Sequence, residues 1–390
     1  MRKSMKFYLG GAILFALPLF LTSCEGTLDD IFGKWDKPTG GNSSSEDIPE
    51  IIAKYEFSVT TLADVNLTED ITSLELTNET GTSLATAELS EGKYTVEKSK
   101  LASATTVWVK AIVGAGDDAS TYVQKLTVDD LTTLEADKKL KMATLGDLMN
   151  SDGTFSAAAE DGKTAVGVIA YLGNDAFTEA IADGGGHGLV LCLKNAASNI
   201  NWSTGVTAYE LGESAKVDNA DALKRTTDVS GYTNTMTLLG KDDPATNYPA
   251  AYKAYHYGEA DGELAAPTGT TGWFLPSAQQ WVKMQEGLGE LDESVIVWDT
   301  WFDSDHTATD NWNTALAKAG TGKYDSMTNA TQIRQYWCSS ERNVTDAVRM
   351  AVDPNASSGA GNKCLRWFYK YKNTGGGPGA EFIVRPILAF

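Results

Sequence analysis

The stretch that decides the fold of the C-terminal region is Gly272-Trp273-Phe274-Leu275-Pro276-Ser277-Ala278-Gln279-Gln280-Trp281. Ser277 and Gln280 have the spacing of a capping box, in which two side chains satisfy backbone N–H groups at the start of a helix. Trp281, Met284 and Leu288 follow at helical spacing, so one face of this helix is apolar. The spacing therefore predicts a helix that begins just after Ser277 and packs against a core.

The sequence around this stretch predicts a mixed domain. A second helix is expected from Asp310 through Trp312 and Leu316 to a terminating Gly320. Strands are expected at residues 165–171, 347–352, 365–371 and 381–390, where apolar runs are separated by glycine-rich turns. Residues 145–390 are therefore expected to form one α+β domain.

Residues 51–143 have a different pattern, in which short β-rich runs recur. These runs lie at residues 55–59, 73–77, 93–96, 106–113 and 121–128. In one of them Val107, Val109, Ala111 and Val113 alternate with other residues, as on one face of a strand. We therefore expect a small all-β sandwich, either immunoglobulin-like or similar to the modules of fimbrillin-type lipoproteins.

Three motifs of the C-terminal region carry a family resemblance. Residues 272–277 (GWFLPS), 336–341 (YWCSSE) and 384–390 (VRPILAF) resemble, in this order, signatures of the DUF1566 and Fibrobacter major paralogous domains. The resemblance implies that residues 145–390 form a C-type lectin-like domain with two helices and a twisted antiparallel sheet. The residues themselves have a structural interpretation, since Trp273, Leu275 and Trp337 fit a core and Pro276 and Pro386 fit turns.

The first residues have the pattern of an export signal. Basic residues at positions 2, 3 and 6 precede an apolar run at residues 7–21, which is short for a membrane-spanning helix, so residues 1–23 are interpreted as a signal peptide. Leu21-Thr22-Ser23-Cys24 resembles the bacterial lipobox, which implies a lipid anchor on Cys24. The Gly- and Ser-rich composition that follows predicts a flexible, lipidated tether over residues 24–50.

Acidic residues follow Cys24 directly, as in Glu25, Asp29 and Asp30. They resemble the start of surface-exported lipoproteins of the Bacteroidetes, which implies an outer-membrane lipoprotein that faces the cell exterior. The alternative is that these acids only solvate the tether.

Composition argues against two classes of function. The 390 residues include 32 Lys and Arg against 52 Asp and Glu, and this net charge of −20 argues against binding to nucleic acid. The three His residues are isolated in sequence, and the chain has neither a Gly-x-Ser-x-Gly nor a Cys-x-x-Cys motif. We therefore expect a binding protein and not an enzyme.

Residues 366–373 (RWFYKYKN) are basic and aromatic within an acidic protein. Recognition surfaces favour such residues. In a strand, Trp367, Tyr369 and Tyr371 share one face, and Arg366, Phe368, Lys370 and Lys372 share the other. Ligand contacts of variable proteins with the lectin-like fold lie in this C-terminal region, so the resemblance favours a site here; the alternative is that the strand is core. The candidate ligand-binding residues are Arg366, Trp367, Tyr369, Lys370, Tyr371 and Asn373, with Arg342 and Asn343 after the Trp337 motif.

An acidic loop and the cysteines remain. One stretch is crowded with acidic residues, namely Asp299, Asp303, Asp305 and Asp310, but it lacks the glycine of an EF-hand. We therefore expect a solvated loop and no cofactor, with calcium as the alternative.

Cys192 lies in an apolar run and is expected to be buried and unpaired. The spacing of Cys338 and Cys364 allows a disulfide that closes a loop of about 25 residues.

These observations predict a cell-surface lipoprotein that binds an extracellular glycan or protein ligand, as an adhesin does. The alternative is a structural fimbrial accessory or tip subunit, whose β-sandwich would exchange strands with pilin subunits.

Overall fold

The structure is a computed structural model that describes residues 53–116, 119–134, 139–176, 186–205, 208–212, 216–223, 229–259, 262–353, 363–376 and 380–390. The expected signal peptide at residues 1–23, Cys24 and the expected tether at residues 24–50 lie outside the described residues. Residues 52–390 form one compact unit. Strand (35%) exceeds helix (20%), a content that is compatible with the expected α+β class and also with a β-rich class. Among the described residues, no helix combines the length and the apolar character needed to cross a membrane.

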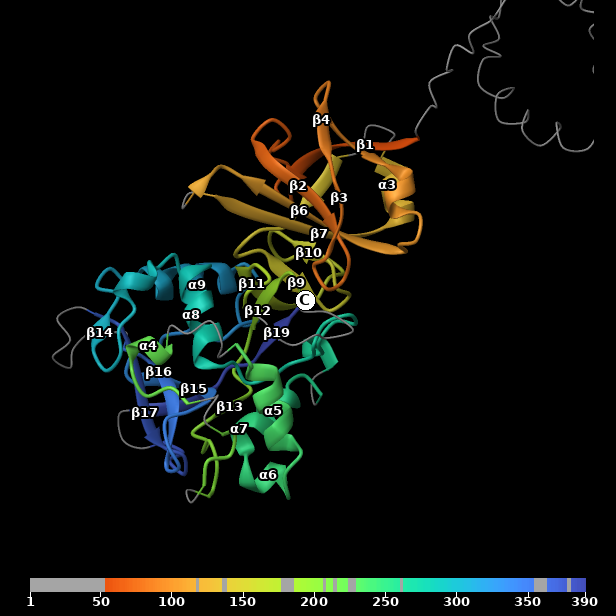
Figure 1. Cartoon of the computed structure of the whole chain (residues 1–390). Coiled ribbons are helices and arrows are strands. Elements are labelled where there is room, and N and C mark those ends of the chain that lie inside the picture. The colour runs from red at the N-terminus through yellow and green to blue at the C-terminus, as the bar shows by residue number, and fades with distance from the viewer. Residues whose placement is uncertain are drawn as a thin grey trace, which may run out of the picture. The chain divides into compact units, whose positions relative to one another are not determined.

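The N-terminal region contains two four-stranded sheets, with strand orders β4-β5-β1-β8 and β3-β2-β6-β7 (Figure 1). Apolar side chains from both sheets form one core, in which Val107, Val109 and Ala111 of β6 are fully buried. The strands are β1 Lys54–Thr61, β2 Ile71–Thr77, β3 Ser83–Thr86, β4 Glu88–Ser90, β5 Lys93–Glu97, β6 Thr106–Val113, β7 Ser120–Thr127 and β8 Lys139–Met142.

This region is not purely β, which corrects the expectation of an all-β sandwich. Helix α3, Val128–Leu134, follows β7 and buries Leu131 in the sandwich core. Its start is fixed by Thr127 and Asp130, because the Asp130 carboxylate accepts from the Thr127 backbone N–H and the Thr127 hydroxyl accepts from the Asp130 N–H. This Thr-x-x-Asp spacing is a helix signal at the end of the expected strand at residues 121–128, and the strand ends at Thr127.

The C-terminal region contains two larger sheets and six described helices. One sheet has the order β10-β9-β11-β12-β19 and the other the order β13-β18-β15-β16-β17-β14. The strands are β9 Leu148–Asn150, β10 Phe155–Ser156, β11 Ala165–Leu172, β12 Gly188–Cys192, β13 Ala197–Ser198, β14 Trp301–Phe302, β15 Ile333–Glu341, β16 Asp346–Val352, β17 Leu365–Tyr371, β18 Ala380–Val384 and β19 Ile387–Ala389. The helices are α4 Ala220–Leu223, α5 Gly231–Leu239, α6 Pro244–Asn247, α7 Pro249–Tyr255, α8 Ala278–Glu286 and α9 Thr307–Ala317.

Helix α8 covers one face of the six-stranded sheet, and both α8 and α9 contact β11 of the five-stranded sheet. Helix α8 begins as the sequence predicts, with the capping box of Ser277 and Gln280 formed, and it packs on β15 and β16. Helix α9 begins at Thr307, before the expected Asp310, because the Asp303 carboxylate accepts the backbone N–H groups of Thr307 and Ala308 at 2.8 and 3.2 Å. Apolar side chains of α8, α9 and the sheet form the largest core of the chain.

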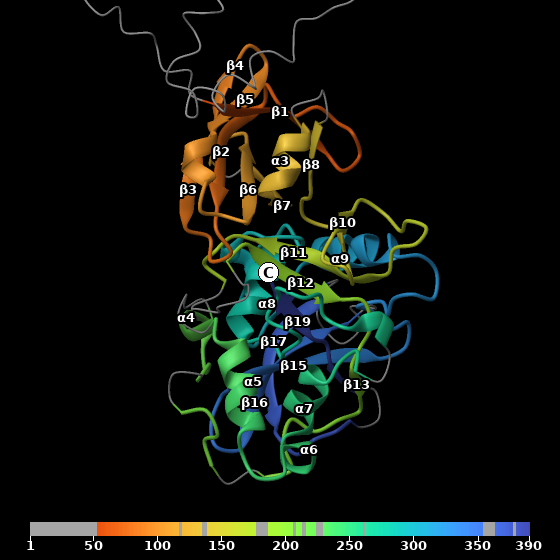
Figure 2. The same cartoon turned by 90° about the vertical axis from the view of Figure 1, so that its right-hand side faces the viewer.

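The other face of this sheet is covered in part by α5 and α7, which contact β15 and β18 (Figures 1 and 2). A separate apolar cluster lies between them and contains Trp202, Leu275 and Trp337. The structural interpretation of Leu275 and Trp337 is therefore confirmed.

The expected final strand at residues 381–390 is wrong, because Arg385-Pro386 divides it. The segment before the break, β18, joins the six-stranded sheet, whereas β19 pairs with β12 in the five-stranded sheet. Proline has no N–H to donate to a ladder. The Arg385 side chain is fully buried, and its guanidinium donates to the carbonyls of Leu193 and Asp325.

Candidate ligand-binding surface

Strand β17 carries most of the candidate ligand-binding residues, and the structure separates them. It lies next to the edge of the six-stranded sheet, where β14 pairs with only its first two residues. Trp367 is fully buried, and its indole N–H donates to Gln285 Oε1 at 3.2 Å. The prediction of Trp367 as a ligand contact is therefore wrong, because α8 covers this part of the strand.

Farther along β17 the same face reaches the surface. We call Arg342, Asn343, Tyr369, Tyr371 and Asn373 the tip surface. The Arg342 guanidinium lies 3.4 Å from the centre of the Tyr369 ring, a stacked cation–π contact. Tyr371 is 58% exposed, and Asn373 is also exposed. The tip surface therefore presents the exposed ring of Tyr371 and the guanidinium of Arg342, which is stacked on Tyr369, and both groups can contact a ligand.

Asn343 shapes the turn between β15 and β16. Its Oδ1 accepts the backbone N–H groups of Thr345 and Asp346, both at 2.8 Å. Asp346 in turn lies 3.8 Å from the Arg342 guanidinium and opposite Tyr371 in the β16–β17 register. The turn therefore positions Arg342 over β17, and Asn343 acts through its backbone contacts.

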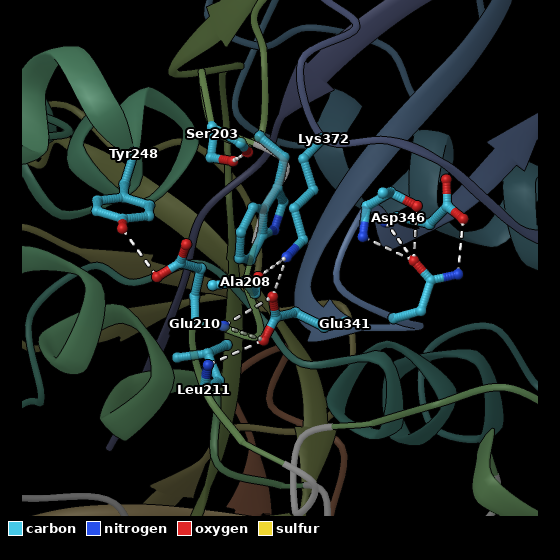
Figure 3. A network of polar contacts seen from close by, with 12 residues as sticks. Ser203, Ala208, Glu210, Leu211, Tyr248, Glu341, Asp346 and Lys372 are labelled. Atoms are coloured by element: carbon cyan, nitrogen blue, oxygen red, sulfur yellow. Dashed lines mark hydrogen bonds and ion pairs between the residues drawn. The ribbon is translucent and has the colours of Figure 1, made fainter.

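Directly beside the tip surface lies a buried ion pair (Figure 3). Lys372 and Glu341 are both fully buried and in contact, and the Lys372 ammonium also donates to the Ala208 carbonyl at 3.0 Å. The Glu341 carboxylate accepts the backbone N–H groups of Glu210 and Leu211 at 3.1 and 2.9 Å. Every charge in this pair thus has polar partners, so the pair fixes the end of β17 to the loop at residues 208–211.

The network continues through the Glu210 side chain (Figure 3). Its carboxylate contacts Lys241 and accepts from the Tyr248 hydroxyl at 2.9 Å. Burial opposes ionisation of Glu210, but the hydrogen bonds from Lys241 and Tyr248 outweigh it and lower its pKa. Burial and the Glu210 carboxylate together raise the pKa of Tyr248 to about 12. Sequence reasoning missed this network because its members lie far apart along the chain.

The glycine-rich segment after β17 is packed where it is described. A Cβ on Gly375 would lie 2.5 Å from Asn201 Oδ1, and a Cβ on Gly376 would lie 2.6 Å from Asn199 Oδ1. Gly376 also has a positive φ of 127°. Glycine is therefore needed here for close approach to another loop.

Arg366 and Lys370 lie on the opposite face of β17 from the tip surface. Arg366 forms an ion pair with Asp299, and its guanidinium carbon lies 4.2 Å from the centre of the Phe368 ring. Asp299 and Asp303 of the acidic loop therefore have structural partners. Within the described part of the chain, no three His, Cys, Asp or Glu side chains come together as a metal site.

The possible disulfide between Cys338 and Cys364 is not formed, and both cysteines are buried, as is Cys192. Strands β15 and β17 are separated by β16, and strands two positions apart lie about 10 Å from each other, beyond the reach of a disulfide. The Cys364 thiol lies instead 3.4 Å from Asp303 Oδ2 and 3.7 Å from the Thr309 hydroxyl.

Comparison with known proteins adds no assignment: no family model, curated protein or solved structure matches this chain.

Proposed function

We propose that this chain is an outer-membrane lipoprotein, anchored by lipid on Cys24, whose lectin-like C-terminal domain faces the cell exterior and binds an extracellular glycan or protein. The observation that carries the proposal is the tip surface, where Tyr371 is 58% exposed beside the stacked Arg342 and Tyr369. Aromatic and guanidinium groups give large contact areas with few rotatable bonds, and they dominate the binding energy of many interfaces.

The contacts that hold the side chains of the tip surface in place favour ligand binding. The buried Lys372–Glu341 pair holds the end of β17, and the Asn343 turn holds Arg342. Side chains that are positioned before a ligand arrives lose little entropy on binding, which increases affinity.

The proposal is tested by probing glycan and protein arrays with the full mature chain and its variants. We expect Tyr371→Ala and Arg342→Ala to weaken binding to the recognised array component by about tenfold or more, with little change in melting temperature. Tyr255→Ala, at a 37% exposed tyrosine on α7, is the matched control and should bind as the wild type does. Equal binding by all four proteins would contradict a site at the tip surface.

The anchor and the orientation have separate tests. Labelled palmitate should enter the wild-type protein but not Cys24→Ala, and equal labelling of both would contradict lipidation at this residue.

Protease added to intact cells should degrade the folded domains. Protection that is lost only on lysis would place them inside the envelope.

A further inference from the structure

The face of the six-stranded sheet opposite Trp367 carries a group of basic side chains. We call Arg349 of β16 and Arg366, Phe368 and Lys370 of β17 the basic face. Arg349 and Phe368 are direct cross-strand neighbours, and the Arg349 guanidinium carbon lies 4.8 Å from the centre of the Phe368 ring. Arg366 lies 4.2 Å from the same ring. Two guanidinium groups therefore approach one aromatic ring.

Two of the three charges of this face, those of Arg349 and Lys370, are not neutralised by a described carboxylate. Arg366 pairs with Asp299, but among the residues that the structure describes neither Arg349 nor Lys370 contacts a carboxylate. Arg349 is only 6% exposed, and its Nε donates a long bond of 3.4 Å to the Tyr369 carbonyl. Burial, with a contribution from Arg366, lowers the pKa of Arg349 to about 9. Burying a cation without a carboxylate partner costs free energy, because the charge loses its water and gains no anion in exchange.

A second buried group on this face also lacks a partner. Gln335 of β15 is 6% exposed, and its Oε1 accepts no hydrogen bond in the described structure. The register places Gln335 beside Ala351, and Ala351 beside Arg366, so the three residues form one cross-strand row. Gln335 also lies two residues from Trp337, the cross-strand neighbour of Arg349. The unpaired acceptor thus lies one strand from Arg349 and two strands from Arg366.

One class of ligand would supply both the carboxylate that Arg349 lacks and the hydrogen-bond donor that Gln335 Oε1 lacks. A carboxylate accepts two parallel hydrogen bonds from a guanidinium, and an unpaired acceptor requires an O–H or N–H donor. A sugar that bears a carboxylate supplies the anion, hydroxyl donors and an apolar ring face. A neutral sugar lacks the charge, and a simple carboxylate lacks the hydroxyl groups.

We propose that the basic face binds a hexuronate, with its carboxylate on Arg349 and Arg366, a hydroxyl donating to Gln335 Oε1, and its ring against Phe368. Asp299 competes for Arg366 in the free protein. Since its side chain is 47% exposed, the ion pair is weak enough for a ligand carboxylate to displace it. The site is independent of the tip surface, which lies on the other face of β17.

The test is calorimetric titration of the full mature chain with D-glucuronate, with D-glucose and acetate as comparison ligands. We expect saturable binding of glucuronate, at least about tenfold weaker binding of both comparison ligands, and weaker binding at high salt. The proposal is overturned if glucuronate does not bind or if glucose binds equally. Equal binding of acetate would overturn the assignment to a sugar.

Variants locate the site. Arg366→Gln should weaken glucuronate binding by about tenfold or more, and Asp299→Asn should strengthen it, because the competing carboxylate is removed. Gln335→Leu should weaken glucuronate binding without lowering the melting temperature, since it removes an unpaired group. Lys253→Gln, an exposed lysine on α7, is the control for net charge, and Tyr371→Ala is the control for the tip surface. Unchanged affinity in Arg366→Gln or Gln335→Leu, or equal loss in Lys253→Gln, would reject the site.

Discussion

Replacing Lys372 by Met tests whether the buried pair holds the end of β17. The substitution removes the ammonium but keeps most of the side-chain volume, so the main effect is to leave the Glu341 carboxylate without its cation. Because both side chains are fully buried, solvent cannot screen the loss. Breaking such a pair costs about 3–5 kcal/mol, and we expect the lower end, about 3 kcal/mol, because Glu210 and Leu211 still donate N–H groups to Glu341.

The assay is urea unfolding followed by tryptophan fluorescence, with the free energy of unfolding taken by linear extrapolation. Trp202, one of the ten tryptophans of the chain, lies close to the site, because its ring is 5.1 Å from the Lys372 ammonium. The double variant Lys372→Met/Glu341→Gln should lose less stability than Lys372→Met alone, because no charge is left buried. Lys141→Met is the control, since its pair with Asp64 is exposed and should contribute at most about 1 kcal/mol.

A loss below about 1 kcal/mol in Lys372→Met, similar to that in Lys141→Met, would refute the reasoning. It would mean that water reaches Glu341 or that the loop at residues 208–211 rearranges to solvate it. A double variant as unstable as Lys372→Met would also count against it, because the cost would then come from lost packing and not from an unpaired charge.

Three further predictions concern other parts of the chain. Burial lowers the pKa of His187 from 6.5 to about 4, so the unfolded chain binds the proton more tightly than the folded chain. The free energy of unfolding should therefore have its full value above pH 6.5 and be about 2 kcal/mol lower at pH 5. The variant His187→Gln should lack this part of the pH dependence. A pH profile of unfolding that is identical in the two proteins would contradict this. Ser277→Ala should destabilise by about 1 kcal/mol in chemical denaturation through loss of the α8 cap, whereas an unchanged midpoint would show that the cap contributes nothing. The thiols of Cys338 and Cys364 should react with a thiol reagent only after unfolding, and a bridged peptide in mass spectrometry would show the structure to be wrong at this point.

Local signals in the sequence predicted the elements that depend on neighbouring residues. The capping box at Ser277 and the alternation in β6 and β17 are such signals, and each element lies within a few residues of its expected bounds. The break at Pro386 was visible as a proline inside an apolar run, but which sheet each half joins depends on β12 and β15, far away in sequence.

The candidate site was less predictable, for the same reason. Alternation correctly divided β17 into two faces, but it could not show that α8 covers Trp367 while Tyr371 is exposed. The roles of Lys372 and Arg349 depend on whether a carboxylate from a distant segment lies beside each one. Charge partners of this kind are set by tertiary packing and leave no local pattern.

The break at Arg385-Pro386 also has a consequence for the order in which the chain can fold. Residues 380–390 supply an inner strand to one sheet and a strand to the other, so neither sheet is complete before this segment has joined. Until then, the edges of β12 and β15 are unpaired and available to other chains. Such long-range pairings form slowly, which exposes the chain to aggregation during folding. The export proposed above would therefore require the chain to stay unfolded until the whole of this segment has crossed the membrane.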